Sequence, residues 1–343
     1  MRGGLKLEKS NKKRMIVLAL IVILILTIII SFQFGRYPIS TKELIGILLS
    51  KVYSMDPFWI ARTEAVLFNI RMPRILLASL VGASLAAAGV AYQGVFQNPM
   101  AAPDVLGASA GAAFGAAFAI LHYSNSYMIT ISAFGFSLLT VILVYIISKK
   151  ARGNPLLGLV LSGIMVSSLF SAGTSFIKLV ADSNDQLPAI TYWLMGSLSG
   201  AKISDITFVI IPISIGLIPL MLLRWRMNVL TMGDEEAKTM GINSKRIRLI
   251  VIICSTLVTA ASVSVSGMIG WVGLVIPHLA RKLVGNNYIY LMPASILFGA
   301  IFLLLVDNIS RNLLATEIPL GILTAFVGAP FFIYLITKGG EHF

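Results

Sequence analysis

Long apolar stretches, separated by short breaks of charged residues, glycine, proline or asparagine, cover most of the chain. A helix that crosses a bilayer needs about 20 predominantly apolar residues, so the stretches predict about ten membrane-spanning helices. They are expected at 15–34, 66–92, 104–121, 127–148, 156–180, 204–223, 247–267, 269–283, 290–310 and 319–337. The eighth is short, and Pro277 and His278 interrupt it, so a broken or re-entrant helix is the alternative there. Stretches such as 16–31 are apolar on every side, which excludes barrel strands and predicts an all-α fold.

Composition supports the same class of protein. Of 343 residues, 57% are hydrophobic and 12% are charged, with a mean hydropathy of +0.90, whereas a soluble domain has about 25% charged residues. We therefore expect one polytopic membrane domain over residues 1–343. The single cysteine, Cys254, lies inside an apolar stretch and can form neither an intrachain disulfide nor a thiolate cluster.

The distribution of charge predicts the orientation. Residues 1–14 are basic and precede an apolar stretch of about 20 residues, longer than the roughly 7 to 15 of a signal peptide core, so this stretch is expected to stay as the first helix. With the N-terminus in the cytoplasm, 18 of the 27 basic residues fall on the cytoplasmic side. Both termini are then cytoplasmic, and the net charge of +13 indicates contact with anionic lipid and not with nucleic acid.

Two connections are long. The segment between residues 36 and 69, on the outer side, is expected to lie at the membrane interface. The loop 224–248, on the cytoplasmic side, is the most polar segment after the N-terminus, and its acids precede a terminal glycine as in a short helix. We expect a cytoplasmic helix of two or three turns there, within Gly233, Asp234, Glu235, Glu236, Ala237, Met240 and Gly241.

Several local motifs have a structural interpretation on physical grounds. Gly107, Gly111 and Gly115 recur every four residues and predict close helix packing. The segment Asn98, Pro99, Met100 is expected to form a turn at the membrane boundary.

Charged residues near the span ends have structural interpretations too. Arg71 and Arg74 are expected to extend towards the interface, and Asp307 and Arg311, four residues apart, to form a salt bridge. His278, with no other histidine or cysteine nearby, does not predict a metal site.

Motifs for catalysis and for energy coupling are absent from the sequence. It contains no G-x-x-x-x-G-K-[ST] loop, no H-E-x-x-H, no G-x-S-x-G and no carboxylate pair within one span. The chain is therefore not expected to be an enzyme, and active transport is expected to need a nucleotide-hydrolysing partner.

Four motifs together resemble the permease family of ATP-binding-cassette importers for iron-siderophores, haem and vitamin B12. They are Arg71-Met-Pro-Arg74 with Gly82, Gly89 and Gln93; Asn98-Pro-Met-Ala-Ala-Pro103 with Leu106 and Gly107; the segment 267–281 around Pro277-His278; and the segment 307–330 with Glu317-Ile-Pro-Leu-Gly321. The sequence departs from the family pattern at Met100, Trp271 and Met240, where the family usually has leucine, phenylalanine and leucine.

The resemblance implies a homodimer in the cell membrane, with two ATPase subunits that bind ATP and magnesium and an external substrate-binding protein. This chain would hold no cofactor. The family's arginines that dock the substrate-binding protein match Arg71, Arg74 and Arg311, which we expect to be exposed. The family's helix that couples to the ATPase matches the segment 233–241, where Ala237 is expected to make a small-residue contact. Part of the family's cytoplasmic gate matches the segment 98–100.

Three questions stay open at this point. The transported chelate is not specified by the sequence, and a heterodimer with a related permease is an alternative to the homodimer. The alternative functions are a permease for free metal ions or another small nutrient, and a secondary transporter.

Overall fold

The computed structural model describes residues 2–51, 53, 56–151 and 155–338, and among these it contains helices and no strand, which confirms the all-α fold. The helices are α1 (Arg2–Gln33), α2 (Thr41–Ser50), α3 (Ala61–Val66), the π-helical turn η1 (Leu67–Arg71), α4 (Met72–Phe96), α5 (Ala108–Leu121), α6 (Ser126–Lys150), α7 (Pro155–Val180), α8 (Gln186–Met195), α9 (Ile203–Leu230), α10 (Asp234–Thr239), α11 (Ser244–Ser266), α12 (Val272–Val284), α13 (Tyr288–Asn312) and α14 (Leu320–Lys338).

Each predicted span coincides with a helix. Within the described residues, seven helices are long and apolar enough to cross a membrane, and α5 and α14 are shorter apolar helices. The chain is therefore a multi-pass membrane protein. The uncertain eighth span is α12, which continues unbroken past Pro277 and is preceded by an irregular stretch with positive φ at Gly267 and Trp271.

Three short helices were not predicted from the sequence. α2 and α3 lie in the segment 36–69, and α2 begins with a capping box in which Ser40 and Glu43 bond to each other's backbone N–H. α8 was not anticipated at all. The helix expected in the loop 224–248 is α10, but its six residues are fewer than the two or three turns expected.

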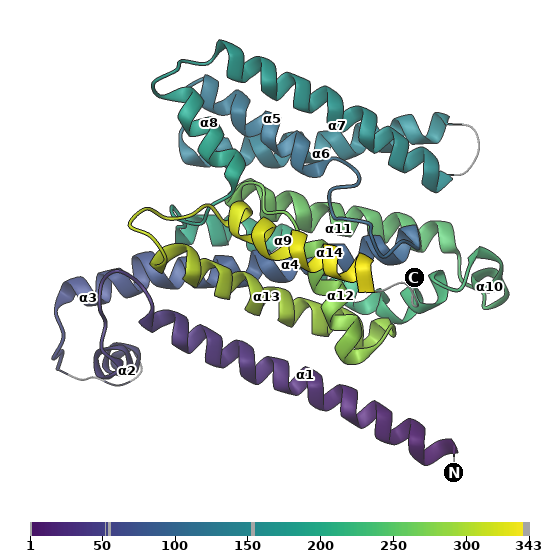
Figure 1. Cartoon of the computed structure of the whole chain (residues 1–343), viewed down its shortest axis with the longest axis horizontal. Helices are drawn as coiled ribbons and strands as arrows, with labels where there is room; N and C mark the ends of the chain where they lie inside the picture. The colour runs from purple at the N-terminus through teal and green to yellow at the C-terminus, as the bar shows by residue number, and fades with distance from the viewer. Residues whose placement is uncertain (1, 52, 54–55, 152–154, 339–343) are drawn as a thin grey trace.

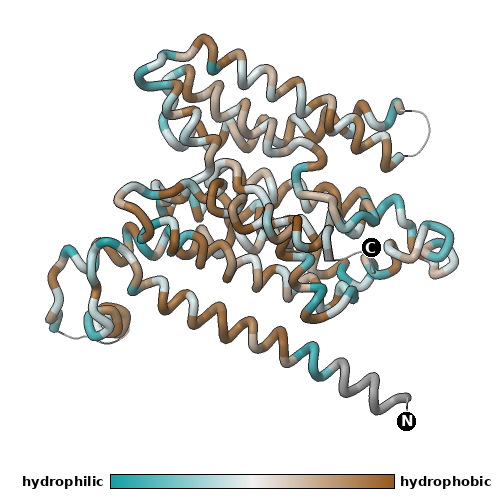
Figure 2. The backbone as a smooth tube through the Cα atoms, viewed as in Figure 1, coloured by the Kyte–Doolittle hydropathy of each residue, from teal (hydrophilic) through white to brown (hydrophobic). Residues whose placement is uncertain are grey.

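The helices form two groups, which Figure 1 shows one above the other, with α5 to α8 in the upper group and α4, α9 and α11 to α14 below it. α11 packs against members of both groups. One end of the molecule, here the α10 end, holds the start of α1, α10 and the end of α14, and the opposite end holds α2, α3 and α8. Figure 2 shows hydrophobic residues along the long helices and hydrophilic residues gathered towards these two ends.

α4 lies at the centre of the lower group and is packed by glycine. In the most apolar part of the continuous segment 61–96, 83% of the residues are buried, whereas the corresponding share in α1 is 17%. A Cβ on Gly82 would lie 2.2 Å from the carbonyl oxygen of Gly299 in α13, and a Cβ on Gly89 would lie 1.8 Å from that of Gly273 in α12. Only glycine permits these backbone contacts, so both positions fix how α4 packs.

α1 follows the edge of the lower group and packs mainly on α13. Within this contact the Asn308 side-chain amide donates to the Ser31 hydroxyl at 2.7 Å. The remaining surface of α1 is apolar and exposed, including Leu18, Val22 and Leu26. Such a surface is stable in contact with lipid.

Candidate functional site

Three arginines meet two carboxylates where α4 begins and α13 ends, at the end opposite α10. Arg74 Nε donates to Asp307 Oδ1 at 2.9 Å, and Arg74 Nη1 donates to Glu317 Oε1 at 2.9 Å. Arg311 Nε lies 3.1 Å from Asp307 Oδ2. The predicted salt bridge between Asp307 and Arg311 is therefore present, and Asp307 also holds Arg74. We call Arg71, Arg74, Arg311, Asp307 and Glu317 the arginine cluster.

Arg71 has a different role in the cluster. Its guanidinium donates to the backbone carbonyl of Phe32, in the last turn of α1, and to that of Tyr37, just past the end of the helix. It thus satisfies acceptors that a helix end leaves unpaired. Arg71 is the last residue of the π-helical turn η1, and Pro73 lies in the first turn of α4 directly after it.

The expectation that these arginines are exposed was wrong. Arg71, Arg74 and Arg311 are 3%, 4% and 6% exposed. A charge inside a membrane protein is tolerated when opposite charge or carbonyl groups neutralise it, and Asp307, Glu317 and the end of α1 supply these partners. The docking role is untested by this structure and remains a prediction.

More exposed arginines lie beside the cluster. A cavity of about 300 Å³ is lined by Arg71, Arg74, Arg311 and Glu317 and also by Arg36 and Arg62. Arg36 and Arg62 are exposed, and Arg62 lies 5.7 Å from the centre of the Tyr37 ring. Five cations and one carboxylate line this cavity, so it is attractive to anionic groups. No sequence motif marks Arg36 or Arg62, because they belong to the motif-free segment 36–69.

α10 projects at the opposite end of the molecule (Figure 1). Gly233 precedes it with a φ of 123°, and Gly241 follows it with a φ of 73°, conformations that favour glycine. Asp234 Oδ1 accepts a hydrogen bond from Arg248 Nη2 at 3.0 Å, which ties α10 to α11. Partial burial raises the pKa of the Asp234 carboxyl, but hydrogen bonding and charge from Arg248 outweigh this and hold the pKa below its usual value.

The exposed surface of α10 differs from the expected one. Ala237 is fully buried against its own chain, and its carbonyl accepts a hydrogen bond from the Ile242 N–H. Glu235, Glu236 and Met240 are exposed instead. The Ala237 side chain is therefore not on the exposed surface of α10, contrary to the expectation, and the role of residues 233–241 in coupling to an ATPase stays a prediction.

The segment between α4 and α5 forms the predicted turn. Gln97 ends α4 with a φ of 50°, and the Asn98 side chain accepts a hydrogen bond from the Met100 N–H at 2.8 Å. Further on, Pro103 lies against Gly273 of α12, where a Cβ would come within 2.1 Å of it. The chain therefore passes between helices over residues 97–107. Pro99 and Met100 are exposed there, and their role in a gate stays a prediction.

The three spaced glycines lie at helix contacts of α5. A Cβ on Gly111 would lie 2.0 Å from Thr140 Oγ1 in α6, and a Cβ on Gly115 would lie 2.5 Å from the Ser132 carbonyl oxygen. Gly107 lies in the same way against Ser167 of α7. Close approach of α5 to both neighbours therefore depends on the absent side chains.

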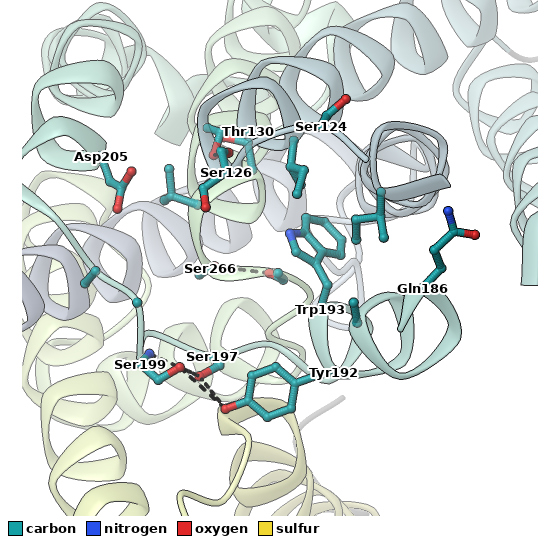
Figure 3. A pocket seen from close by; sticks show the side chains of 18 of the residues that line it. Ser124, Ser126, Thr130, Gln186, Tyr192, Trp193, Ser197, Ser199, Asp205 and Ser266 are labelled. Atoms are coloured by element: carbon teal, nitrogen blue, oxygen red, sulfur yellow. Dashed lines mark hydrogen bonds between the residues drawn. The ribbon is translucent and has the colours of Figure 1, made fainter. Parts of the chain in front are cut away.

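A larger polar pocket of about 560 Å³ lies between α5, α6, α8, the start of α9 and the end of α11. Figure 3 shows hydroxyl groups of Ser126, Thr130 and Tyr192 around it, with Trp193 in its wall. The Tyr192 hydroxyl is 3.3 Å from Ser197 Oγ. No sequence motif indicates this pocket, because its residues come from separate segments and only the fold assembles them.

The described residues contain no group of three or more His, Cys, Asp or Glu side chains that could hold a metal ion. His278 lies 6.3 Å, centre to centre, from the Phe331 ring, and Cys254 is buried.

Comparison with known proteins identifies the family. The profile of the FecCD transport family matches residues 23–338. The chain belongs to the FecCD transport family. Its relatives in this family are named as permeases of several importers. It is 40% identical over 332 residues to the molybdate import system permease protein MolB of Haemophilus influenzae, covering 95% of this chain and 97% of the relative.

Two further relatives carry other names. The hemin transport system permease protein HmuU of Yersinia pestis is 34% identical and covers 94% of this chain and 95% of its own. The cobalamin import system permease protein BtuC of Halobacterium salinarum is 41% identical over 274 residues, covering 80% of this chain and 73% of its own. The FecCD match also includes the arginine cluster, residues 97–107 and α10.

A solved structure confirms the FecCD fold. The structure described as an inward-facing conformation of a putative metal-chelate type ABC transporter aligns with a TM-score of 0.85 and 39% sequence identity. The alignment covers 95% of this chain and 99% of the other. The chain is therefore a permease of the ABC importer type, and membrane permeases of this family are not themselves enzymes.

Proposed function

We propose that this chain forms the membrane path of an ATP-driven importer for a metal chelate, as one of two permease copies in the cell membrane. Two separate ATPase subunits bind ATP and magnesium below it, and an external protein delivers the substrate. Membership of the FecCD family over residues 23–338 carries the proposal. The α10 end faces the cytoplasm, which agrees with the excess of basic residues there.

The substrate class rests on the names of the relatives. Hemin and cobalamin are metal chelates, and iron-chelate permeases are 38% identical to this chain over 324 residues. An oxyanion is the second candidate, because the molybdate permease is 40% identical over 95% of this chain. The test is to purify the cognate external protein and identify its bound ligand by mass spectrometry. A bound amino acid or sugar would contradict both candidates.

The exposed surface of α10 is proposed to seat in the ATPase. Charge reversal by Glu235→Lys should weaken this contact and lower ATP-driven uptake in proteoliposomes about tenfold, equivalent to about 1.4 kcal/mol of lost coupling. The matched control is Asp56→Lys, which makes the same change at an exposed residue of the opposite end. Equal uptake by both variants would place the ATPase contact elsewhere. ATP hydrolysis by the purified permease alone would contradict the need for a partner.

Docking of the external protein is proposed to involve the cavity beside the arginine cluster. Because Arg36 and Arg62 are exposed, Arg36→Glu and Arg62→Glu test the charge without breaking the buried ion pairs. Each should weaken binding of the external protein, more at low salt than at high salt, because exposed charges are screened over about 8 Å at physiological ionic strength.

Lys42→Glu is the control for docking, since Lys42 is exposed on α2 and does not line the cavity. Binding is measured by surface plasmon resonance on the permease in nanodiscs. Unchanged affinity of both arginine variants would contradict docking at this cavity.

A further inference from the structure

A second cavity, of about 980 Å³, lies at the α10 end between the end of α6, the start of α7, α10 and the start of α11. The loop after α4 also reaches it through Gln97. We call it the basic cavity, because Lys149, Lys245, Arg246 and Arg248 line it together with one acid, Asp234. None of the family motifs contains these four cations.

The charge in the basic cavity is only partly neutralised. Asp234 pairs with Arg248 at 3.0 Å, while Arg248 Nε is buried and has no hydrogen-bond partner. Among the residues that the structure describes, no carboxylate lies within salt-bridge distance of Lys149, Lys245 or Arg246. α11 begins at the cavity, where Asn243 caps it by accepting a hydrogen bond from the Arg246 N–H, and the positive end of its helix dipole favours an anion nearby.

The rest of the lining is mixed. Gln97, Ser148 and Asn243 are polar, whereas Tyr145, Leu156, Leu159, Leu249 and Ile252 form an apolar wall. Ile146 and Ile253, next in sequence to Tyr145 and Ile252, are 49% and 56% exposed, so α6 and α11 carry apolar surface accessible to lipid at the depth of this wall. A free phosphate or a nucleotide would leave this wall in contact with water, whereas an acyl chain covers it.

We propose that the basic cavity binds one anionic phospholipid of the cytoplasmic leaflet. Its phosphate lies among Lys149, Lys245 and Arg246, and its acyl chains follow the apolar wall. Basic pockets between membrane helices on the cytoplasmic side bind anionic headgroups in this way. Because Gly233 and Asp234 line the same cavity, the lipid braces the base of α10. The proposal relies on the proposed function only for the orientation of the α10 end.

The test measures lipid binding directly and needs no transport. The full-length permease is placed in nanodiscs of dioleoylphosphatidylcholine with 20% dioleoylphosphatidylglycerol, which presents the anionic lipid on both sides. Native mass spectrometry should detect one tightly retained phosphatidylglycerol. The double variant Lys245→Gln, Arg246→Gln should retain at least tenfold less, and Lys149→Gln, a single change of an exposed side chain, should retain less as well.

Arg224→Gln, Arg226→Gln is the matched control, because it removes two cations near the same end, on α9, outside the cavity. Its lipid retention should equal that of the wild type. The thermal stability of every variant is measured in pure phosphatidylcholine, and only variants as stable as the wild type are compared. Equal retention by all variants would overturn the proposal.

Two further measurements distinguish the lipid from other occupants of the basic cavity, namely free phosphate and the ATPase subunit. Addition of 10 mM inorganic phosphate should not displace the lipid, and displacement would show a site for free phosphate instead. Assembly with the ATPase subunit should leave the lipid in place. Loss of the lipid on assembly would show that acidic side chains of the partner fill the basic cavity, and would overturn the proposal.

Discussion

At the scale of single residues, Asp307 connects more of the molecule than any motif suggested. It is fully buried and pairs with Arg74 of α4 and with Arg311 of its own helix. Glu317, in the connection to α14, holds the other side of Arg74. The start of α4 is thus joined by ion pairs to the distant segment 307–317, within a low-dielectric interior where an unpaired charge is very costly.

Asp307→Asn should therefore destabilise the protein by about 3–5 kcal/mol, because Arg74 and Arg311 lose their shared carboxylate while they stay buried. The measurement is thermal unfolding of the purified protein in detergent. Lys51→Ala is the matched control, since it breaks the exposed Lys51–Glu64 pair and should cost less than about 1 kcal/mol. Similar unfolding temperatures for the two variants would contradict the assigned role of Asp307.

At the scale of elements, small residues decide which helices touch. α5 approaches α6 at Gly111 and Gly115, and α4 approaches α12 and α13 at Gly89 and Gly82. The apolar surfaces of membrane helices do not distinguish a neighbouring helix from lipid, so close backbone contact provides the specificity. Glycine spacing therefore carries information that hydropathy does not.

The change Gly111→Ala should destabilise the protein by about 1–3 kcal/mol, because its Cβ would overlap Thr140 Oγ1 and the Phe136 carbonyl oxygen. Gly135→Ala is the matched control in α6, since no atom lies within 4 Å of a Cβ at that position. It should be neutral or stabilising by about 0.5–1 kcal/mol. Urea unfolding in detergent measures both, and equal destabilisation would contradict the assigned packing.

At the scale of the whole molecule, the helices alternate in direction and leave two chemically different ends. The start of α1 and the end of α14 both lie at the α10 end (Figure 1). The arginine cluster lies at the other end, where Asp307 and Glu317 pair with Arg74 and Arg311, and the basic cavity lies at the α10 end, where one carboxylate faces four cations. The basic residues of the predicted cytoplasmic segments, 18 of the 27 in the sequence, favour a cytoplasmic α10 end.

Cysteine labelling tests this orientation. In a Cys254→Ser background, Tyr123→Cys reports on the end opposite α10, where Tyr123 is 77% exposed, and Lys150→Cys, at an exposed residue, reports on the α10 end. A membrane-impermeant maleimide added to intact cells should label only the first variant, and both should be labelled after permeabilisation. Labelling of only the second in intact cells would reverse the assigned orientation.

Hydrophobic pattern alone determined the class of the molecule and the place of its spans. Every predicted span coincides with a helix, because a segment in lipid must satisfy its backbone hydrogen bonds internally and must be long and apolar. The motifs were sufficient to identify the FecCD family. They also located α10 and the spaced glycines, since glycine and short acidic helix starts have strong local preferences.

Tertiary structure decided which neighbours the charged and small side chains of the motifs contact. The sequence did not show that the three arginines are buried, that Ala237 faces its own chain, or that α2 and α8 exist. Nor did it indicate the basic cavity, whose cations come from α6 and α11. Burial and pairing depend on which distant segments meet, and local sequence does not encode those contacts. A short helix and a charged side chain are stable only where the rest of the fold supplies their partners.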